Sequence, residues 1–169
     1  MIKPQTAVPP LSLPTLDGGP WTLNASKPSH FTFLFFYRGY HCPICKNYLR
    51  SIQQKLEPLD ELGISAVAIS SDTQERAQKS RDEWGIDRLP MAYGLSIDEA
   101  RSWGLYVSRG INAGEPERFS EPGLFVVEPD GTLFAASIQT MPFTRPAIQE
   151  LLAGFSYIVN QGYPARGEA

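Results

Sequence analysis

Cysteine and histidine are scarce in this chain, and their scarcity excludes several kinds of site. The 169 residues include two cysteines, Cys42 and Cys45, and two histidines, His30 and His41. Two cysteines cannot build a disulfide framework, a four-cysteine zinc site or an iron–sulfur cluster held by cysteine alone. All the cysteine of the protein therefore stands in one Cys-Pro-Ile-Cys segment.

Long apolar runs and a strong excess of one charge are also missing. No stretch approaches the ~20 apolar residues of a membrane span, and the opening Met1–Thr6 begins no apolar signal segment. The net charge of −3 does not indicate a nucleic-acid-binding surface. We therefore expect a cytoplasmic protein with no membrane and no nucleic-acid partner. In that compartment paired cysteines are more often redox-active than structural.

Length and composition favour one globular domain. Hydrophobic residues make up 42% of the chain and charged residues 20%, which is the balance of a folded protein, and a domain usually takes about 100–200 residues. We predict a single domain over 1–169. It divides into an N-terminal hairpin extension (1–30), a core (31–158) and a tail (159–169).

Segments with the pattern of buried strands alternate with segments of helical period. The expected strands are 31–37, 64–69, 89–93 and a late hairpin of 124–127 with 132–136, and the expected helices are 43–59, 71–84, 96–104 and 144–158. Residues 108–121 are polar and contain glycine, so we expect a loop there. Strand–helix alternation with a late hairpin predicts a layered α/β fold around a mixed sheet.

The two cysteines stand where a strand gives way to a helix. Pro43 suits the first helical position, where its missing N–H costs nothing, so Cys42 is expected at the N-cap and Cys45 in the first turn. A helix N-terminus stabilises a thiolate, which is the reactive form of cysteine. The nearby cations, among them Arg38, have two interpretations: ordinary solvated charge, or a positive field that lowers the pKa of a thiol.

The cysteines and His41 also have interpretations that involve no catalysis. Two buried cysteines could simply pack in the core, because free cysteine is often buried. A zinc site would need both histidines, and His41 directly adjoins Cys42, which makes a tetrahedron hard to close. His41 itself is either a packing residue or a neighbour that tunes the thiol. We predict no metal ion and no cofactor.

The segment Phe35–Cys45 resembles the active-site segment of peroxiredoxin-like proteins of the alkyl hydroperoxide reductase / thiol-specific antioxidant (AhpC/TSA) family, within the thioredoxin-fold superfamily. Asp17–Leu23, Ala68–Asp72 and Gly123–Gly131 resemble further parts of that family. The resemblance implies a thioredoxin-like three-layer α/β fold. It has a central mixed sheet, an N-terminal β-hairpin extension and helices on both faces.

The chain also departs from the family pattern Pro-x-x-x-Thr-x-x-Cys. With Cys45 set on the peroxide-attacking cysteine, Arg38 takes the place of the Pro and Cys42 that of the Thr. Pro122 stands where the family has a distal arginine, and thioredoxins have a cis-proline there. We therefore hypothesise a cis bond at Pro122. Three further arginines are possible substitute cations, although surface charge is the simpler interpretation of each: Arg109, Arg118 and Arg145.

The resemblance implies a thiol-dependent redox enzyme that reduces hydroperoxides through Cys42 and Cys45, cycling between a dithiol and an intramolecular disulfide. Its site would be supported by Arg38, His41, Pro43 and Pro122. Alignment favours Cys45 as the attacker, and the exposure expected at a helix start favours Cys42. The alternatives are a thioredoxin-like disulfide reductase with Cys42 as nucleophile, and a redox sensor or interaction module.

The expected partners follow from that chemistry. The substrate would be a small hydroperoxide or a disulfide, and an external thiol system such as thioredoxin or glutathione would reduce the enzyme. A homodimer is possible, as in many relatives of this family.

Overall fold

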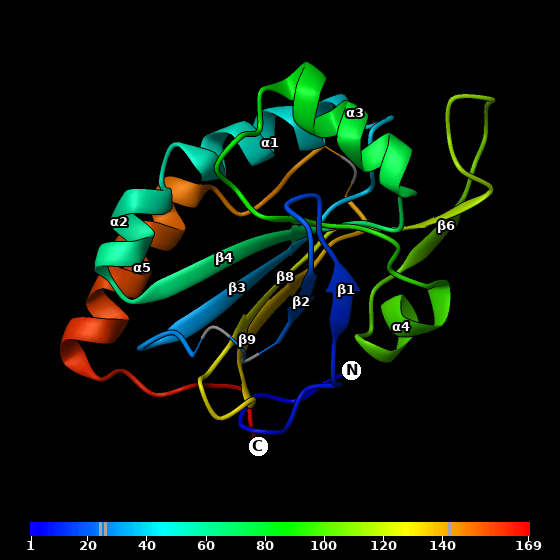
Figure 1. Ribbon diagram of the computed structural model, residues 1–169. Coiled ribbons are helices and arrows are strands. Elements are labelled where there is room, and N and C mark those ends of the chain that lie inside the picture. Colours follow the sequence, from blue (N-terminus) through cyan, green and yellow to red (C-terminus); the bar gives the residue numbers. More distant parts are fainter. Residues whose placement is uncertain (24, 26, 142) are drawn as a thin grey trace.

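A five-stranded mixed sheet forms the centre of the computed structural model (Figure 1), which describes residues 1–23, 25, 27–141 and 143–169. Two positions of the predicted extension (24 and 26) and one of the predicted core (142) lie outside the described residues. The strand order is β5-β4-β3-β8-β9. Strands β3, β4 and β5 run parallel, whereas β8 pairs antiparallel with both β3 and β9.

The sheet strands are β3 (Phe31–Phe36), β4 (Ile64–Ile69), β5 (Met91–Ala92), β8 (Gly123–Val127) and β9 (Leu133–Ile138). The helices are α1 (Pro43–Gln53), α2 (Leu56–Glu61), α3 (Gln74–Trp84), α4 (Ile97–Ser102) and α5 (Ile148–Gln161). Two small antiparallel pairs join β1 (Ser12–Pro14) to β2 (Pro20–Thr22) and β6 (Val107–Arg109) to β7 (Arg118–Ser120).

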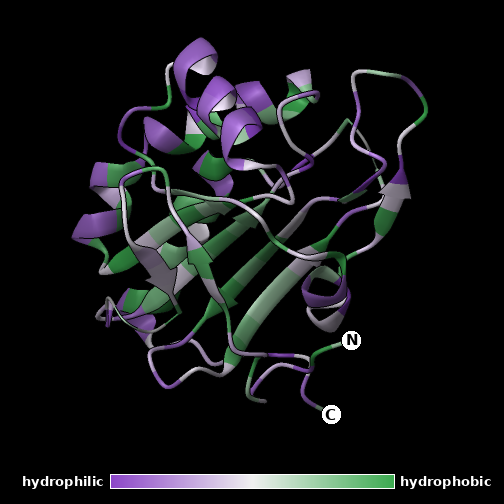
Figure 2. Ribbon diagram, turned by 45° about the vertical axis from the view of Figure 1, so that its right-hand side comes forward, coloured by the Kyte–Doolittle hydropathy of each residue, from purple (hydrophilic) through white to green (hydrophobic). Residues whose placement is uncertain are grey.

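Strand β3 divides the core because successive side chains of a strand point to opposite faces. Phe31, Phe33 and Phe35 pack with residues of α1, α2 and α5. Leu34 and Phe36 pack on the other face, beneath α4 and the β1–β2 hairpin. Figure 2 shows the hydrophobic residues concentrated on the central strands, with hydrophilic residues prominent on the helices. The predicted three-layer α/β fold, with helices on both faces and an N-terminal hairpin, is confirmed.

The predicted helix over 43–59 is interrupted, and the prediction of one continuous helix is wrong. Helix α1 ends at Gln53 and α2 begins at Leu56. Within one helix, Pro58 would lack its N–H and its ring would press on the carbonyl of Gln54. The break places Pro58 in the first turn of α2, where no hydrogen bond is lost.

Two further boundaries differ from the sequence prediction. The segment 108–121 was expected to be a loop, yet it contains β7 and most of β6, paired through Ser108 and Phe119. Phe119 is buried and supplies an apolar contact, although the segment 108–121 as a whole is polar in composition. The last helix starts at Ile148 and has no side-chain cap, so the predicted start at residue 144 is wrong. Helix α5 runs on to Gln161, and the division into extension, core and tail stays a prediction.

Candidate active site

Cys42 and Cys45 lie together at the start of α1, directly after the loop that follows β3. Cys42 is the N-cap in extended conformation, and Pro43 opens the helix, as the sequence predicted. The Cys45 amide N–H donates to Cys42 Sγ over 3.2 Å. The Cys42 thiol therefore takes the part that a Ser or Asp side chain usually plays at a helix start.

Both cysteines are buried, each with 1% of its surface exposed. The expectation that Cys42 would be exposed is wrong. Although it lies at a helix end, Cys42 belongs to the core cluster between the sheet and the helices. A small molecule can reach such a sulfur more easily than the bulky disulfide of a folded protein.

The environment separates the acidities of the two thiols. A hydrogen bond from the Cys45 side chain is the main cause that lowers the pKa of Cys42 to about 6; the Cys45 amide and the charges of Arg145 and Arg38 act in the same direction, against burial. Burial raises the pKa of Cys45 well above its usual range, and the hydrogen bond to Cys42 raises it further. At neutral pH Cys42 is therefore the thiolate and Cys45 the thiol.

Arg38 contributes to this field from the loop that follows β3. Its Nε lies 3.3 Å from Glu121 Oε2, and the guanidinium stands 4.9 Å from the centroid of the Phe119 ring. The other oxygen of the Glu121 carboxylate, Oε1, accepts a hydrogen bond from Ser108 Oγ over 2.6 Å. The sequence singled out Arg38, but not the buried Glu121 that orients it.

Arg145 contacts a cysteine of the site directly. Its Nη2 donates to Cys45 Sγ over 3.6 Å, which is within hydrogen-bond range for sulfur. The next residue is held by Tyr48, whose hydroxyl donates to the Pro146 carbonyl over 2.8 Å. The sequence treated Arg145 as surface charge, and this contact overturns that interpretation. Arg109 and Arg118 are exposed on the β6–β7 hairpin.

His41 directs its imidazole toward α3. Its Nδ1 lies 3.4 Å from Arg76 Nη2, and its ring stands edge-on to Phe119 at 4.5 Å. Because a guanidinium only donates, Nδ1 accepts and the ring proton sits on Nε2. Burial, together with the charge of Arg38, lowers the pKa of His41. The imidazole is therefore neutral at pH 7. Its contacts join the loop before α1 to Arg76 of α3 and to Phe119 of β7.

Pro122 stands immediately before β8, and its carbonyl accepts the Gln139 amide N–H. The hypothesis of a cis bond at Pro122 is wrong, since every peptide bond in the described ranges is trans. The preceding residue, Glu121, pairs its amide with the Tyr106 carbonyl and leads straight into the strand. Pro122 lines a small crevice together with Tyr48 and Arg145.

The described residues contain no group of three or more His, Cys, Asp or Glu side chains arranged to hold a metal ion. His30 is engaged elsewhere, with its Nδ1 2.9 Å from the Leu62 carbonyl. In the same part of the chain, no helix combines the length and the apolar character that crossing a membrane requires.

Comparison with known proteins decides the family. The model of the AhpC/TSA family matches residues 4–136. The chain belongs to the AhpC/TSA family. The resemblance stated from the segment around the cysteines is thereby confirmed, and the matched residues include both of them.

Individual proteins are also similar to this chain, in sequence or in fold. Alkyl hydroperoxide reductase C of Staphylococcus epidermidis is 23% identical over 130 residues, which cover 76% of this chain. The match spans only 61% of that relative's length. Peroxidoxin BcpB from Mycobacterium tuberculosis superposes with a TM-score of 0.74 at 21% identity, over 94% of this chain and 99% of the other. Peroxiredoxin 6 of Arenicola marina gives a TM-score of 0.78 at 15% identity, over 96% and 76%.

The sequence prediction placed Asp72 only at the start of a helix over 71–84. Thr73 is the residue that caps α3, and Asp72 turns its carboxylate into the interior toward the loop before Cys42. One signal was available: Ser71, Asp72 and Thr73 all suit a helix start, which needs only one of them.

Proposed function

We propose that this protein is an oxidoreductase that reduces hydroperoxides, with Cys42 as the attacking thiolate and Cys45 as the thiol that resolves the intermediate. The observation that carries the proposal is the hydrogen bond that the Cys45 amide N–H donates to the Cys42 sulfur over 3.2 Å. The Cys45 side chain also lowers the pKa of Cys42, so a thiolate is stabilised on one cysteine with a protonated thiol beside it.

The proposed cycle has three steps. The Cys42 thiolate attacks the outer oxygen of the hydroperoxide; the O–O bond breaks, Cys42 becomes a sulfenic acid, and the alkoxide leaves as an alcohol after taking a proton. The Cys45 sulfur, once deprotonated, attacks the Cys42 sulfur. The disulfide bond forms as the S–O bond breaks, and the hydroxide that leaves is protonated to water. Two molecules of a small external thiol such as glutathione then supply the two electrons that restore both thiols.

Two cations support the first step. Arg145 and Arg38 both lower the pKa of Cys42, and Arg145 contacts the neighbouring sulfur. A guanidinium near the breaking O–O bond stabilises the negative charge that develops on the leaving oxygen. Arg145 comes from the segment before α5, whereas the family's distal arginine would stand at the position of Pro122.

Burial favours a hydroperoxide over a protein disulfide as the oxidant. Both sulfurs are 1% exposed, so a disulfide within a folded partner would have to displace the surrounding chain before contact. The disulfide-reductase alternative and the redox-sensor alternative use the same thiolate and are tested beside the first. The cytoplasmic location and the homodimer remain predictions.

Stopped-flow mixing of the reduced protein with hydrogen peroxide and with tert-butyl hydroperoxide tests the proposal. We expect Cys42→Ser to react no faster than the double variant in which both Cys42 and Cys45 are replaced by serine. Cys45→Ser should consume one equivalent of peroxide and stop at a sulfenic acid that dimedone traps. Wild type should end as a disulfide between Cys42 and Cys45, identified by peptide mass spectrometry.

Other outcomes would point elsewhere. Peroxide consumption no faster than that of free cysteine, with rapid reduction of insulin disulfides, would establish the disulfide reductase. Trapping of the sulfenic acid on Cys45 in Cys42→Ser would make Cys45 the attacker. Binding of a partner protein in only one oxidation state, without turnover, would support the sensor or interaction module.

A further inference from the structure

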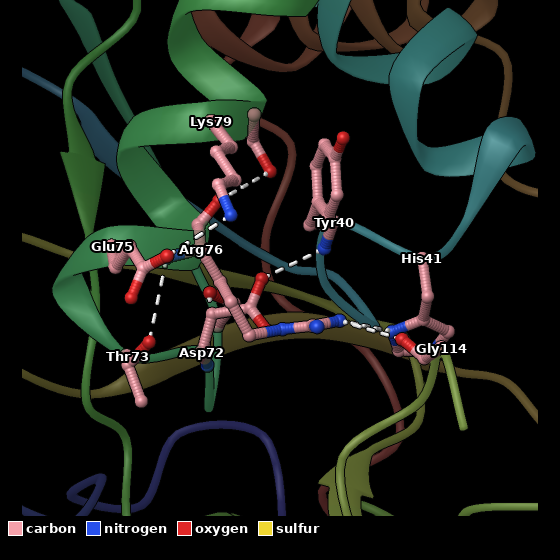
Figure 3. Close-up of polar contacts among 10 residues, drawn as sticks. Tyr40, His41, Asp72, Thr73, Glu75, Arg76, Lys79 and Gly114 are labelled. Carbon is pink, nitrogen blue, oxygen red and sulfur yellow. Dashed lines mark hydrogen bonds and ion pairs between the residues drawn. The ribbon is translucent and has the colours of Figure 1, made fainter.

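The carboxylate of Asp72 lies beneath the loop that leads into Cys42. Asp72 follows β4 and is 1% exposed. One oxygen accepts the Tyr40 amide N–H over 2.7 Å, and the other accepts Arg76 Nε over 2.9 Å. Figure 3 shows these contacts converging from the loop and from the first turn of α3. A buried carboxylate is retained where its charge is paired and hydrogen-bonded, and both conditions are met here.

Gly39 brings the loop into direct contact with this carboxylate. A Cβ built on Gly39 would lie 2.7 Å from Asp72 Oδ1, and the φ angle of +124° is one that side chains rarely adopt. The carbonyl of Gly39 then accepts the amide N–H of Cys42 over 3.1 Å. Gly39 therefore contacts the Asp72 carboxylate and, through its own carbonyl, also holds the main chain of Cys42.

Arg76 extends the same set of contacts to His41 of this loop and to the β6–β7 hairpin. Its Nη2 lies 3.4 Å from His41 Nδ1 and donates to the Gly114 carbonyl over 3.2 Å. In Figure 3 the guanidinium reaches from α3 across to His41 and Gly114. One planar group thus connects the loop before Cys42, the buried carboxylate and the turn of the β6–β7 hairpin. The fork geometry of arginine makes this possible, whereas a lysine ammonium is a single point.

We propose that Asp72 and Arg76 are positioning residues for the thiol chemistry: together they hold Gly39–His41 so that Cys42 stays at the N-cap of α1 with its sulfur on the Cys45 amide. The inference rests on the proposed function only in taking Cys42 as the reactive thiol. Neither residue needs to touch a substrate.

Charge and positioning predict opposite signs for one substitution. The groups whose charges or hydrogen bonds act on the Cys42 sulfur are Cys45, Arg38 and Arg145. Asp72→Asn removes a negative charge that repels a thiolate, and loss of this Coulomb repulsion alone would lower the pKa of Cys42 slightly. If Asp72 acts by holding the loop, the same change loosens the cap and raises the pKa of Cys42 toward its ordinary value.

The test is the pH dependence of Cys42 alkylation by iodoacetamide in the reduced protein, located by peptide mass spectrometry. We expect the midpoint to move upward in Asp72→Asn and, by less, in Arg76→Lys, which keeps the charge but cannot bridge His41 and Gly114. A midpoint that rises from 6 to 8 lowers the thiolate fraction at pH 7 about tenfold. Glu75→Gln is the matched control, because it removes an exposed ion pair with Lys79 from the same helix.

Folding and function are separated by the design. Circular dichroism and thermal unfolding establish that each variant is folded, and Arg76→Lys carries the test if Asp72→Asn does not fold. Alkylation needs no peroxide, so an inactive peroxidase with shifted midpoints would leave this inference standing while removing the proposed function. A downward shift in Asp72→Asn, or an unchanged midpoint in folded Arg76→Lys, overturns the positioning role.

Discussion

The two segments that adjoin the cysteines are held in different ways. The loop Arg38–His41 is hydrogen-bonded to a buried carboxylate and an arginine through its main chain and His41. The segment from Gln139 to Ala147 is paired near its two ends, by the Gln139 amide with Pro122 and by the Tyr48 hydroxyl with Pro146. Between these ends, Met141 and Phe143 expose 55% and 75% of their surface.

This difference assigns different tasks to the two segments. The loop before α1 determines where the Cys42 sulfur lies, and a nucleophile gains from being fixed before the substrate arrives. The segment before α5 brings Arg145 to Cys45 from a more exposed part of the surface.

Gly39→Ala should have the largest effect, because it disturbs the loop Arg38–His41, the more firmly held of the two segments. The new Cβ would clash with the Asp72 carboxylate on top of an unfavourable φ, so we expect a loss of about 3 kcal/mol in the free energy of unfolding. Gly85→Ala is the control, because its φ is also positive but nothing lies within 4 Å of the new Cβ.

Chemical denaturation of both variants measures the difference. Gly85→Ala should lose about 1 kcal/mol, the cost of the left-handed backbone alone. Equal losses in the two variants would mean that the loop is not held against Asp72.

Arg145→Gln comes next and tests the contribution of the second segment. Losing a charged hydrogen bond to the cysteine site should slow peroxide reduction roughly 10- to 100-fold, equivalent to about 1.4–3 kcal/mol. Stopped-flow rates at saturating reductant measure it. Arg118→Gln removes an exposed cation from the β6–β7 hairpin and should leave the rate unchanged; an equal loss in both variants would reduce the effect of Arg145 to general surface charge.

Phe143→Ser should have the smallest effect, and it tests whether the segment before α5 is less firmly packed than the loop before α1. Because its side chain is mostly solvated, the free energy of unfolding should change by no more than about 0.5 kcal/mol. Thermal unfolding beside Phe119→Ser, a buried ring of the β6–β7 hairpin, checks this. A loss for Phe143→Ser as large as that for Phe119→Ser would show that the segment before α5 is packed as firmly as the core.

Much of the fold was predictable because its local patterns agree with its tertiary contacts. The aromatic run of β3 is buried on both faces, and the start of α1 follows from Pro43. Helix α3 ends at Trp84, as the sequence predicted. In these places propensity, periodicity and burial all favour the same structure.

The site was less predictable, since its decisive contacts join residues distant in sequence. Arg145 reaches Cys45 across 100 positions, and Tyr40 meets Asp72 across 32. Neither pairing leaves a period or a motif in the chain. The burial of Cys42 was missed for the same reason: a helix end is usually solvated, and only the tertiary packing covers this one.

The capping role of Cys42 has a consequence for the reduction potential of the pair. The Cys45 amide stabilises the Cys42 sulfur most when that sulfur carries a full negative charge, which it does only in the reduced protein. Stabilising the dithiol form relative to the disulfide makes the couple more oxidising, the same relation that makes DsbA a stronger oxidant than thioredoxin. In the proposed cycle, the turn of helix that stabilises the Cys42 thiolate would therefore also make the resulting disulfide easier for an external thiol to reduce.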